Sequence, residues 1–167
     1  MKITFTIIFI SLIGLTIFGQ DAEKMNSKDV KKEMSADEKD VLKVVVHLFD
    51  GMRAGDSSMV SSCFYYHVDM FTSYTNKKGE AVFKKDDVQK FLDAVGTPHD
   101  EIWDEQIWDT EIRIDGNLAQ VWTKYRFYLD DKFSHCGVDA ILMTKTTDGW
   151  KIFHLSDTRQ RNGCEVK

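Results

Sequence analysis

Apolar residues recur at helical spacing in the first part of the chain that follows its leader. Val41, Val45 and Leu48 lie three or four positions apart, which predicts an amphipathic helix with one buried face. Ser35 and Glu38 precede this run with the spacing of a capping box, in which each side chain accepts a hydrogen bond from the backbone of the other residue. The first helix is therefore predicted to begin directly after Ser35.

Shorter elements follow this helix. The pattern predicts a serine-rich second helix over residues 57–64, strands over 65–75 and 80–83 joined by a turn, and a third helix that begins at 86 or 87 and ends at Gly96. Residues 101–114 predict a further strand, because apolar and polar residues alternate there. In this alternation Ile102 and Trp108 are expected to point inward and Glu105 outward.

Three long segments between residues 118 and 159 are rich in Val, Ile, Tyr, Phe, Trp and Thr and are separated by two short polar turns. This pattern predicts an antiparallel meander. The element order is helix, helix, hairpin, helix and four strands, which is typical of the α+β class. Because strongly twisted sheets coil, we expect a cone-shaped, curved antiparallel sheet that wraps around the N-terminal helices and leaves a cavity at its open end.

Alternation sorts the side chains of this sheet onto two faces, provided that each turn holds an even number of residues. The face expected toward the helices is mostly apolar and collects Ile112, Ile114, Ala119, Val121, Tyr125, Phe127, Cys136, Val138, Ala140, Leu142, Phe153 and Leu155, with Thr123, Ser134, Asp157 and Arg159 as its polar members. The opposite face collects Gln120, Trp122, Lys124, Arg126, Tyr128, His135, Asp139, Met143, Trp150 and His154. A bulge near either turn would exchange the faces and point His135 and Asp139 inward instead.

The N-terminus has the layout of a secretory signal peptide. Lys2 precedes an almost wholly apolar run over residues 3–18, and Gly19 follows at the expected cleavage point. We divide the chain into a signal peptide (1–19), a charged tether (20–34) and one domain (35–167), and expect a secreted or periplasmic protein. The alternative is that the apolar run stays in the membrane as an anchor helix.

Charge and cysteine content exclude several classes of protein. The net charge is -5 without a basic cluster, so we expect no nucleic-acid partner and, after signal removal, no membrane partner. Cys63 and Cys136 are expected to be buried, while Cys164 could pair with either of them or with another chain. No cofactor or metal site is expected, because phosphate-binding glycine loops and CxxC spacings are missing from the sequence.

Several motifs resemble those of a known superfamily: FDGMRAGD in the first helix, then GNLAQVW, HCGVD and DGWKI in the strands. Together with the element order, they resemble the nuclear transport factor 2-like superfamily over about residues 40–159. Within it, the sequence is similar to the SnoaL-like group and to the group described as lumazine-binding, which comprise small secreted bacterial proteins. The resemblance implies a curved sheet around helices, frequent dimers and a pocket at the wide end. It implies no particular catalytic residue, because the enzymes of this superfamily share no catalytic motif.

The leading hypothesis is therefore a secreted, homodimeric protein that binds a small apolar or aromatic molecule in a pocket on the curved sheet. The expected ligand contacts are Trp122, Tyr125, Arg126, Asp157 and Arg159.

An alternative hypothesis is a cofactor-independent isomerase, dehydratase or cyclase. His135 would act as acid or base, Asp139 as its electrostatic partner or a second base, and Tyr125 or Arg159 would stabilise an oxyanion. Against this stands a purely structural role, in which His135, Asp139 and Arg126 form a polar patch at the interface of a homodimer. A third possibility is an interaction module whose binding face carries Trp122, Arg126 and Trp150.

Overall fold

The computed structural model describes residues 33–164, and every structural statement below refers to that part of the chain. The predicted signal peptide and residues 20–32 of the predicted tether lie outside it. The described helices are α1 (Ala36–Ala54), α2 (Ser57–Ser62) and α3 (Val88–Gly96). The predicted capping box is confirmed, since the Ser35 amide donates to Glu38 Oε2 at 2.6 Å and the Glu38 amide donates to Ser35 Oγ at 3.2 Å. Gly55 ends α1 in the left-handed conformation that glycine adopts most easily, with a φ of 64°.

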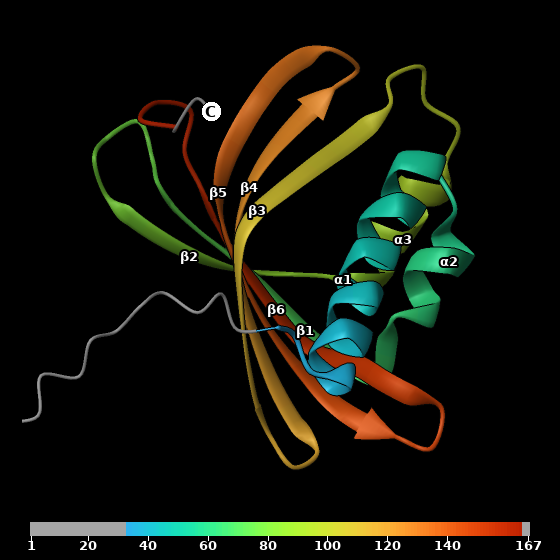
Figure 1. The fold of residues 1–167 in the computed structure, drawn as a ribbon. Helices are drawn as coiled ribbons and strands as arrows, with labels where there is room; N and C mark the ends of the chain where they lie inside the picture. The colour runs from blue at the N-terminus through green and yellow to red at the C-terminus, as the bar shows by residue number, and fades with distance from the viewer. Residues whose placement is uncertain (1–32, 165–167) are drawn as a thin grey trace, which may run out of the picture. The chain divides into compact units, whose positions relative to one another are not determined.

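The strands form one sheet in the order β2-β1-β6-β5-β4-β3 (Figure 1). Their bounds are β1 (Phe64–Thr75), β2 (Ala81–Asp86), β3 (Trp103–Asp115), β4 (Leu118–Leu129), β5 (Lys132–Thr146) and β6 (Gly149–Arg159). The predicted α+β class, element order and curved sheet are confirmed. One pairing differs from the expected antiparallel sheet, because β1 lies parallel to β6. This pairing attaches the β1–β2 hairpin to the far edge of the meander.

The helices all lie on one side of the sheet, which we call the inner face (Figure 1). Helix α1 packs on β3 and β6, α2 packs on α1, and α3 packs on α2 and β1. The hydrophobic core fills the space between them and includes Val41, Val45, Leu48, Val121, Ile141, Met143 and Ile152. The opposite side of the sheet is called the outer face below.

Irregular positions in three strands change which side chains reach the inner face. The strand register shifts in β3 between Trp108 and Glu111, in β5 between Phe133 and His135, and in β6 between Ile152 and His154. Each shift places one extra residue in a strand, so the simple alternation of faces is reversed beyond it. The simple alternation predicted for β5 was therefore wrong, and the alternative with a bulge next to the β4–β5 turn is confirmed.

The reversal exchanges two sets of residues. The β5 residues expected inward but found outward are Cys136, Val138, Ala140 and Leu142, and the residues expected outward but found inward are His135, Asp139, Met143 and Trp150. Trp150 is accordingly buried at 3% exposure.

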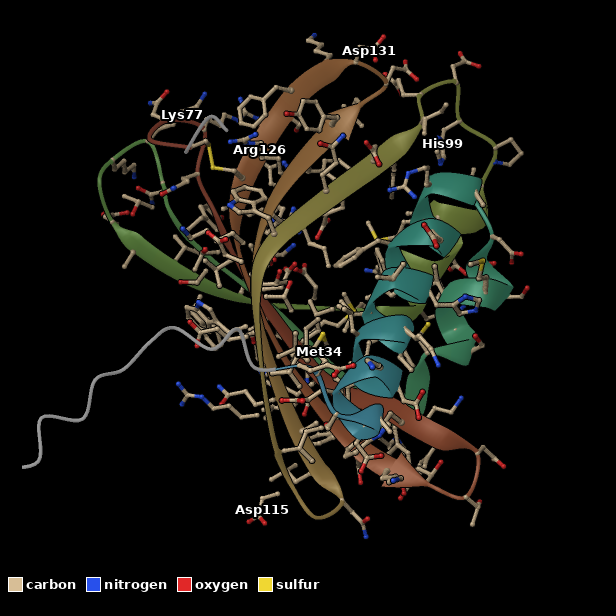
Figure 2. The ribbon with its side chains drawn as sticks, in the orientation of Figure 1. Met34, Lys77, His99, Asp115, Arg126 and Asp131 are labelled. Atoms are coloured by element: carbon tan, nitrogen blue, oxygen red, sulfur yellow. A yellow bond between two sulfur atoms is a disulfide. The ribbon has the colours of Figure 1, made fainter. Side chains whose placement is uncertain are left out.

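The end of the described chain is tied to β5 by a disulfide between Cys136 and Cys164 (Figure 2). Backbone hydrogen bonds of 2.9 Å in both directions between Cys136 and Gln160 support the same connection. Cys63 is the free, buried thiol, and burial raises its pKa to about 11. Of the partners left open for Cys164 by the sequence, the structure shows Cys136.

Between residues 33 and 164, no helix combines the length and the apolar character needed to cross a membrane.

Candidate functional site

The candidate site lies on the inner face, where β3, β4 and β5 run toward the β4–β5 turn. On β4 the inward residues are Thr123, Tyr125 and Phe127, and the first and last of these pair with Asp139 and His135 of β5. Residues that pair directly across antiparallel strands point to the same face. His135 and Asp139 therefore both point inward, as the catalytic hypothesis requires.

Glu105 joins them from β3, where it pairs with the inward residue Phe127. This position corrects the sequence-based expectation that Glu105 points outward. The reason is the irregularity around Asp109, which has a φ of 50° and reverses the alternation between Ile112 and Glu105. The only hint in the sequence was that Asp109 tolerates the left-handed conformation better than most residues do.

Glu105 and Asp139, which we call the acid pair, share a side-chain hydrogen bond. Burial raises the pKa of Glu105 to about 7. Burial, followed by repulsion from Glu105, also raises the pKa of Asp139 well above its ordinary value. Two carboxyl groups in contact cannot both ionise easily, so the pair holds a proton near neutral pH.

Asp157 of β6 stands beside the acid pair and is fully engaged. Its Oδ1 accepts from Thr72 Oγ1 at 2.6 Å, and its Oδ2 accepts from Arg159 Nε at 2.7 Å and lies 3.0 Å from the Tyr125 hydroxyl. Asp157 and Arg159 thus form an ion pair at this site. Burial and the charge of Asp157 raise the pKa of Tyr125, so its hydroxyl stays protonated and serves as a donor.

Gly137 makes this arrangement possible. A Cβ atom at this position would overlap the carbonyl group of Thr158 on the neighbouring strand. That carbonyl oxygen lies 2.9 Å from the Tyr125 hydroxyl, as a second acceptor for its proton. The HCGVD motif therefore needs its glycine for the close approach of β6, not for a turn.

Aromatic rings line the inner face around the acid pair. The ring centroids lie 4.8 Å apart for His99 and Trp103, 6.2 Å for Trp103 and Phe127, 5.0 Å for Phe127 and His135, and 5.7 Å for His135 and Tyr125. We call this set the aromatic row. Burial, assisted by the positive charge of Arg159, lowers the pKa of His135 to about 4, so its imidazole is neutral at physiological pH.

Trp122 and Arg126 do not belong to this site. Both point to the outer face, where Trp122 is 47% exposed and the Arg126 guanidinium lies 4.7 Å from the centre of the Trp108 ring. Figure 2 shows the labelled Arg126 on the side of the sheet away from the helices. Arg126 pairs with Cys136 instead of His135, so the expected polar patch of His135, Asp139 and Arg126 does not form.

In the part of the chain that the structure describes, no three or more His, Cys, Asp or Glu side chains are grouped so that they could bind a metal ion.

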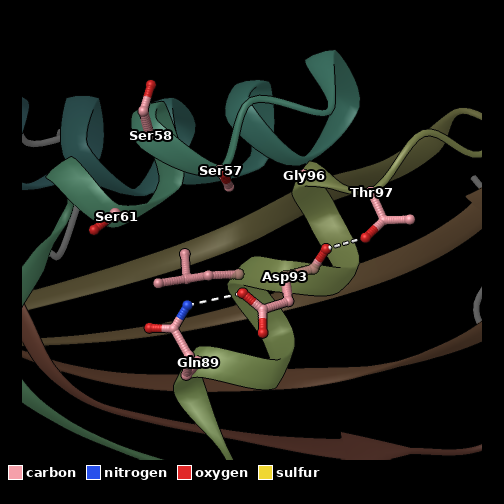
Figure 3. A pocket seen from close by; sticks show the side chains of 8 residues that line it. Ser57, Ser58, Ser61, Gln89, Asp93, Gly96 and Thr97 are labelled. Atoms are coloured by element: carbon pink, nitrogen blue, oxygen red, sulfur yellow. Dashed lines mark hydrogen bonds between the residues drawn. The ribbon is translucent and has the colours of Figure 1, made fainter.

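A separate hollow of about 560 Å³ lies between α2 and α3 (Figure 3). Its polar groups already bond within the wall, since Gln89 Nε2 donates to Asp93 Oδ1 at 2.8 Å and Thr97 Oγ1 donates to the Asp93 carbonyl at 2.7 Å. A Cβ on Gly96 would come within 2.7 Å of Ser57 Oγ, so the two helices are in close contact there. We assign no ligand to this hollow.

Comparison with known proteins identifies the fold. No family model and no curated protein matches the sequence. A nuclear transport factor 2-like protein from Cytophaga hutchinsonii matches the structure with a TM-score of 0.59 at 14% identity, over 76% of this chain and 100% of that one. A nuclear transport factor 2-like protein with a cystatin-like fold from Novosphingobium aromaticivorans has a TM-score of 0.59 at 8% identity, over 76% and 84%.

One further structure carries an activity in its name. A candidate dehydratase of the nuclear transport factor 2-like family from Streptomyces avermitilis matches with a TM-score of 0.52 at 14% identity, over 74% of this chain and 95% of that one. The structural matches show that the chain has the nuclear transport factor 2-like fold, as the motifs predicted. At identities this low, they show no more than the fold.

Proposed function

We propose that this protein binds a small molecule with a flat apolar body on the inner face of its sheet. The observation that carries the proposal is the aromatic row around the acid pair, in which Asp139 is buried and Glu105 is partly buried. Trp103, Phe127 and His135 are only partly buried, and Trp103 and Phe127 pack against the hydrophobic core, so part of each residue remains accessible to a ligand. Apolar and aromatic walls with a few convergent polar groups are typical of small-molecule sites.

The proposal is tested with 2-naphthol, a neutral aromatic probe, and the Phe127→Leu variant. Leucine keeps an apolar side chain but removes the ring, so we expect the affinity to fall about two- to tenfold, the usual contribution of one aromatic pair. Phe133→Leu is the matched control, because Phe133 lies on the outer face of β5 and packs on Tyr128. Equal affinities of both variants and the unchanged protein, measured by fluorescence titration, would contradict the proposal.

A second candidate function is a cofactor-independent isomerase, dehydratase or cyclase. The acid pair favours it, because one carboxylate can remove a proton from a carbonyl compound while the other carboxyl group returns it. The Tyr125 hydroxyl lies nearby, but its proton is donated to Asp157 and the Thr158 carbonyl, so it would stabilise a developing oxyanion only after turning away from them. His135 faces the same site in neutral form and can accept or donate through its imidazole nitrogens.

This activity is tested by following the conversion of a β,γ-unsaturated ketone to its conjugated isomer by absorbance. If the acid pair transfers the proton, Asp139→Asn and Glu105→Gln should each lower kcat by about a hundredfold or more. Glu111→Gln is the control, since Glu111 is an exposed carboxylate on the outer face of the same β3 strand. Activity that survives in both acid-pair variants would rule out this mechanism.

We also propose that the protein acts outside the cytoplasm. The predicted signal peptide supports this location, and so does the Cys136–Cys164 disulfide, because such bonds persist mainly in oxidising compartments. Cell fractionation, with N-terminal sequencing of the mature protein, tests the location and the expected cleavage after Gly19.

A further inference from the structure

We propose that the ligand of the inner face is a small arylalkylamine in its protonated form. Its ammonium group would donate to Asp139, and its ring would lie along the aromatic row. The inference rests on the proposed function and adds to it the charge and chemical class of the ligand.

The first reason is an acceptor that lacks a donor. Asp139 is 2% exposed, and no N–H or hydroxyl donor of the described residues bonds to its buried Oδ2 atom, which leaves a proton held with Glu105 as its possible partner within the protein. A buried acceptor without a donor destabilises the folded state, so such atoms are rare in folded proteins. A proton held within the acid pair, or a donor on a ligand, would satisfy it.

The second reason is the balance of charge around that acceptor. Asp157 is neutralised by Arg159 through a 2.7 Å ion pair, and Asp104 by Arg53 through a 2.6 Å ion pair. Among these carboxylates, the acid pair therefore carries the negative charge that no ion pair neutralises. With one proton bound, Glu105 and Asp139 carry a single negative charge. An ammonium ion can replace that proton, so binding would bring in one positive charge and release one proton to solvent.

The third reason is the chemistry of the surrounding rings. The faces of Trp and Phe rings carry partial negative charge and attract cations, so Trp103 and Phe127 favour an ammonium group over a carboxylate. Neutral His135 adds no competing positive charge at physiological pH. The combination of buried carboxylate and aromatic walls is thus complementary to an organic cation with an aryl substituent.

Binding should depend on pH in a direction that follows from this exchange. The charged groups that act on the acid pair are Asp104 on β3 and Asp157 and Arg159 on β6, and the Tyr125 hydroxyl faces it from β4. Arg53 of α1 reaches this region only through its ion pair with Asp104. Because the pair must lose its proton, affinity should rise as the pH increases from about 5 to about 8, while the amine remains protonated.

The test compares three probes that share one ring: benzylamine, benzyl alcohol and benzoate. Isothermal titration calorimetry on the full chain should show that benzylamine binds about tenfold or more tightly than the other two, the scale of one charge-assisted hydrogen bond. Titrations in two buffers with different ionisation enthalpies should reveal the released proton. Asp139→Asn should remove the preference for the amine, whereas the outer-face control Glu111→Gln should keep it.

Asparagine resembles the protonated form of Asp139 in shape and charge, so the Asp139→Asn variant is expected to fold, and Glu105→Gln provides a second variant. A preference for benzylamine that persists in both variants would overturn the inference. Equal binding of benzyl alcohol and benzylamine, weakened for both by Phe127→Leu, would overturn it while leaving the proposed function in place. Tightest binding of benzoate would overturn it in favour of an anion site. Absence of binding for all three probes would contradict both.

Discussion

Folding shifts the pKa of Glu105 and the pKa of His135 in opposite directions, although both residues lie on strands next to β4. The folded protein raises the pKa of Glu105 from 4.5 to about 7, so between these values the folded state keeps a proton that the unfolded chain has lost. The free energy of unfolding therefore falls as the pH rises through this window. For His135 the pKa drops from 6.5 to about 4, so the unfolded chain holds the extra proton and stability rises with pH from 4 to 6.5.

These opposite contributions predict a specific pH dependence for Asp139→Asn. Near pH 3, below the ordinary value of 3.8, Asp139 is protonated in both the folded and the unfolded protein, so the neutral variant should match the unchanged protein in stability. Above that value the unfolded chain loses the proton, whereas the raised pKa makes the folded protein keep it, so the unchanged protein loses stability relative to the variant. Near pH 8 the variant should be the more stable by an amount on the order of 1 kcal/mol, the scale of one pKa unit. Urea unfolding at both pH values measures the difference. A variant that is less stable at pH 8 would show that the Asp139 charge stabilises the fold.

At the scale of elements, the bulges mark the positions beyond which alternation no longer predicts the inward side chains. Periodicity and capping predicted α1 correctly, because Ser35, Glu38 and the apolar positions of one helix are local signals. Alternation also predicted the inward side chains of β4, such as Val121 and Tyr125. It failed for Glu105 and His135, because a single extra residue in a neighbouring part of the strand reverses the faces and leaves no clear mark in one sequence.

A covalent bond joins the C-terminal segment after β6 to strand β5. The Cys136–Cys164 disulfide closes a loop with a sequence separation of 28 residues. Cys164→Ser should lower the free energy of unfolding by about 2–4 kcal/mol, because the unfolded chain then loses a constraint on its conformational freedom. Urea unfolding measures the change, and a reducing agent provides the control, since it should make the unchanged protein equal to the variant. A variant as stable as the oxidised protein would show that the bond does not constrain the fold.

At the scale of the whole described domain, the element order determined the fold class, but the site depends on contacts between distant strands. The acid pair joins β3 to β5 across β4, and the interactions of Asp157 bring together Thr72, Tyr125 and Arg159 from three further positions in the sheet. Such convergence depends on sheet curvature and strand register. Neither property can be obtained from alternation within single strands. The sequence therefore predicted candidate residues for the site better than it predicted which of them come together.

Exposed aromatic side chains on the outer face predict how copies of the chain assemble. Trp122 and Phe133 are 47% and 39% exposed there, and the Trp108 ring lies under Arg126. Exposed aromatic side chains beside a stacked arginine are typical of protein interfaces. We therefore expect a homodimer through the outer face, and expect Trp122→Ala to shift it toward monomer in static light scattering. Tyr66→Ala is the control, because Tyr66 is 75% exposed on β1, which is separated from β4 by β6 and β5. An unchanged protein that is monomeric at high concentration, or a dimer unaffected by Trp122→Ala, would contradict this arrangement.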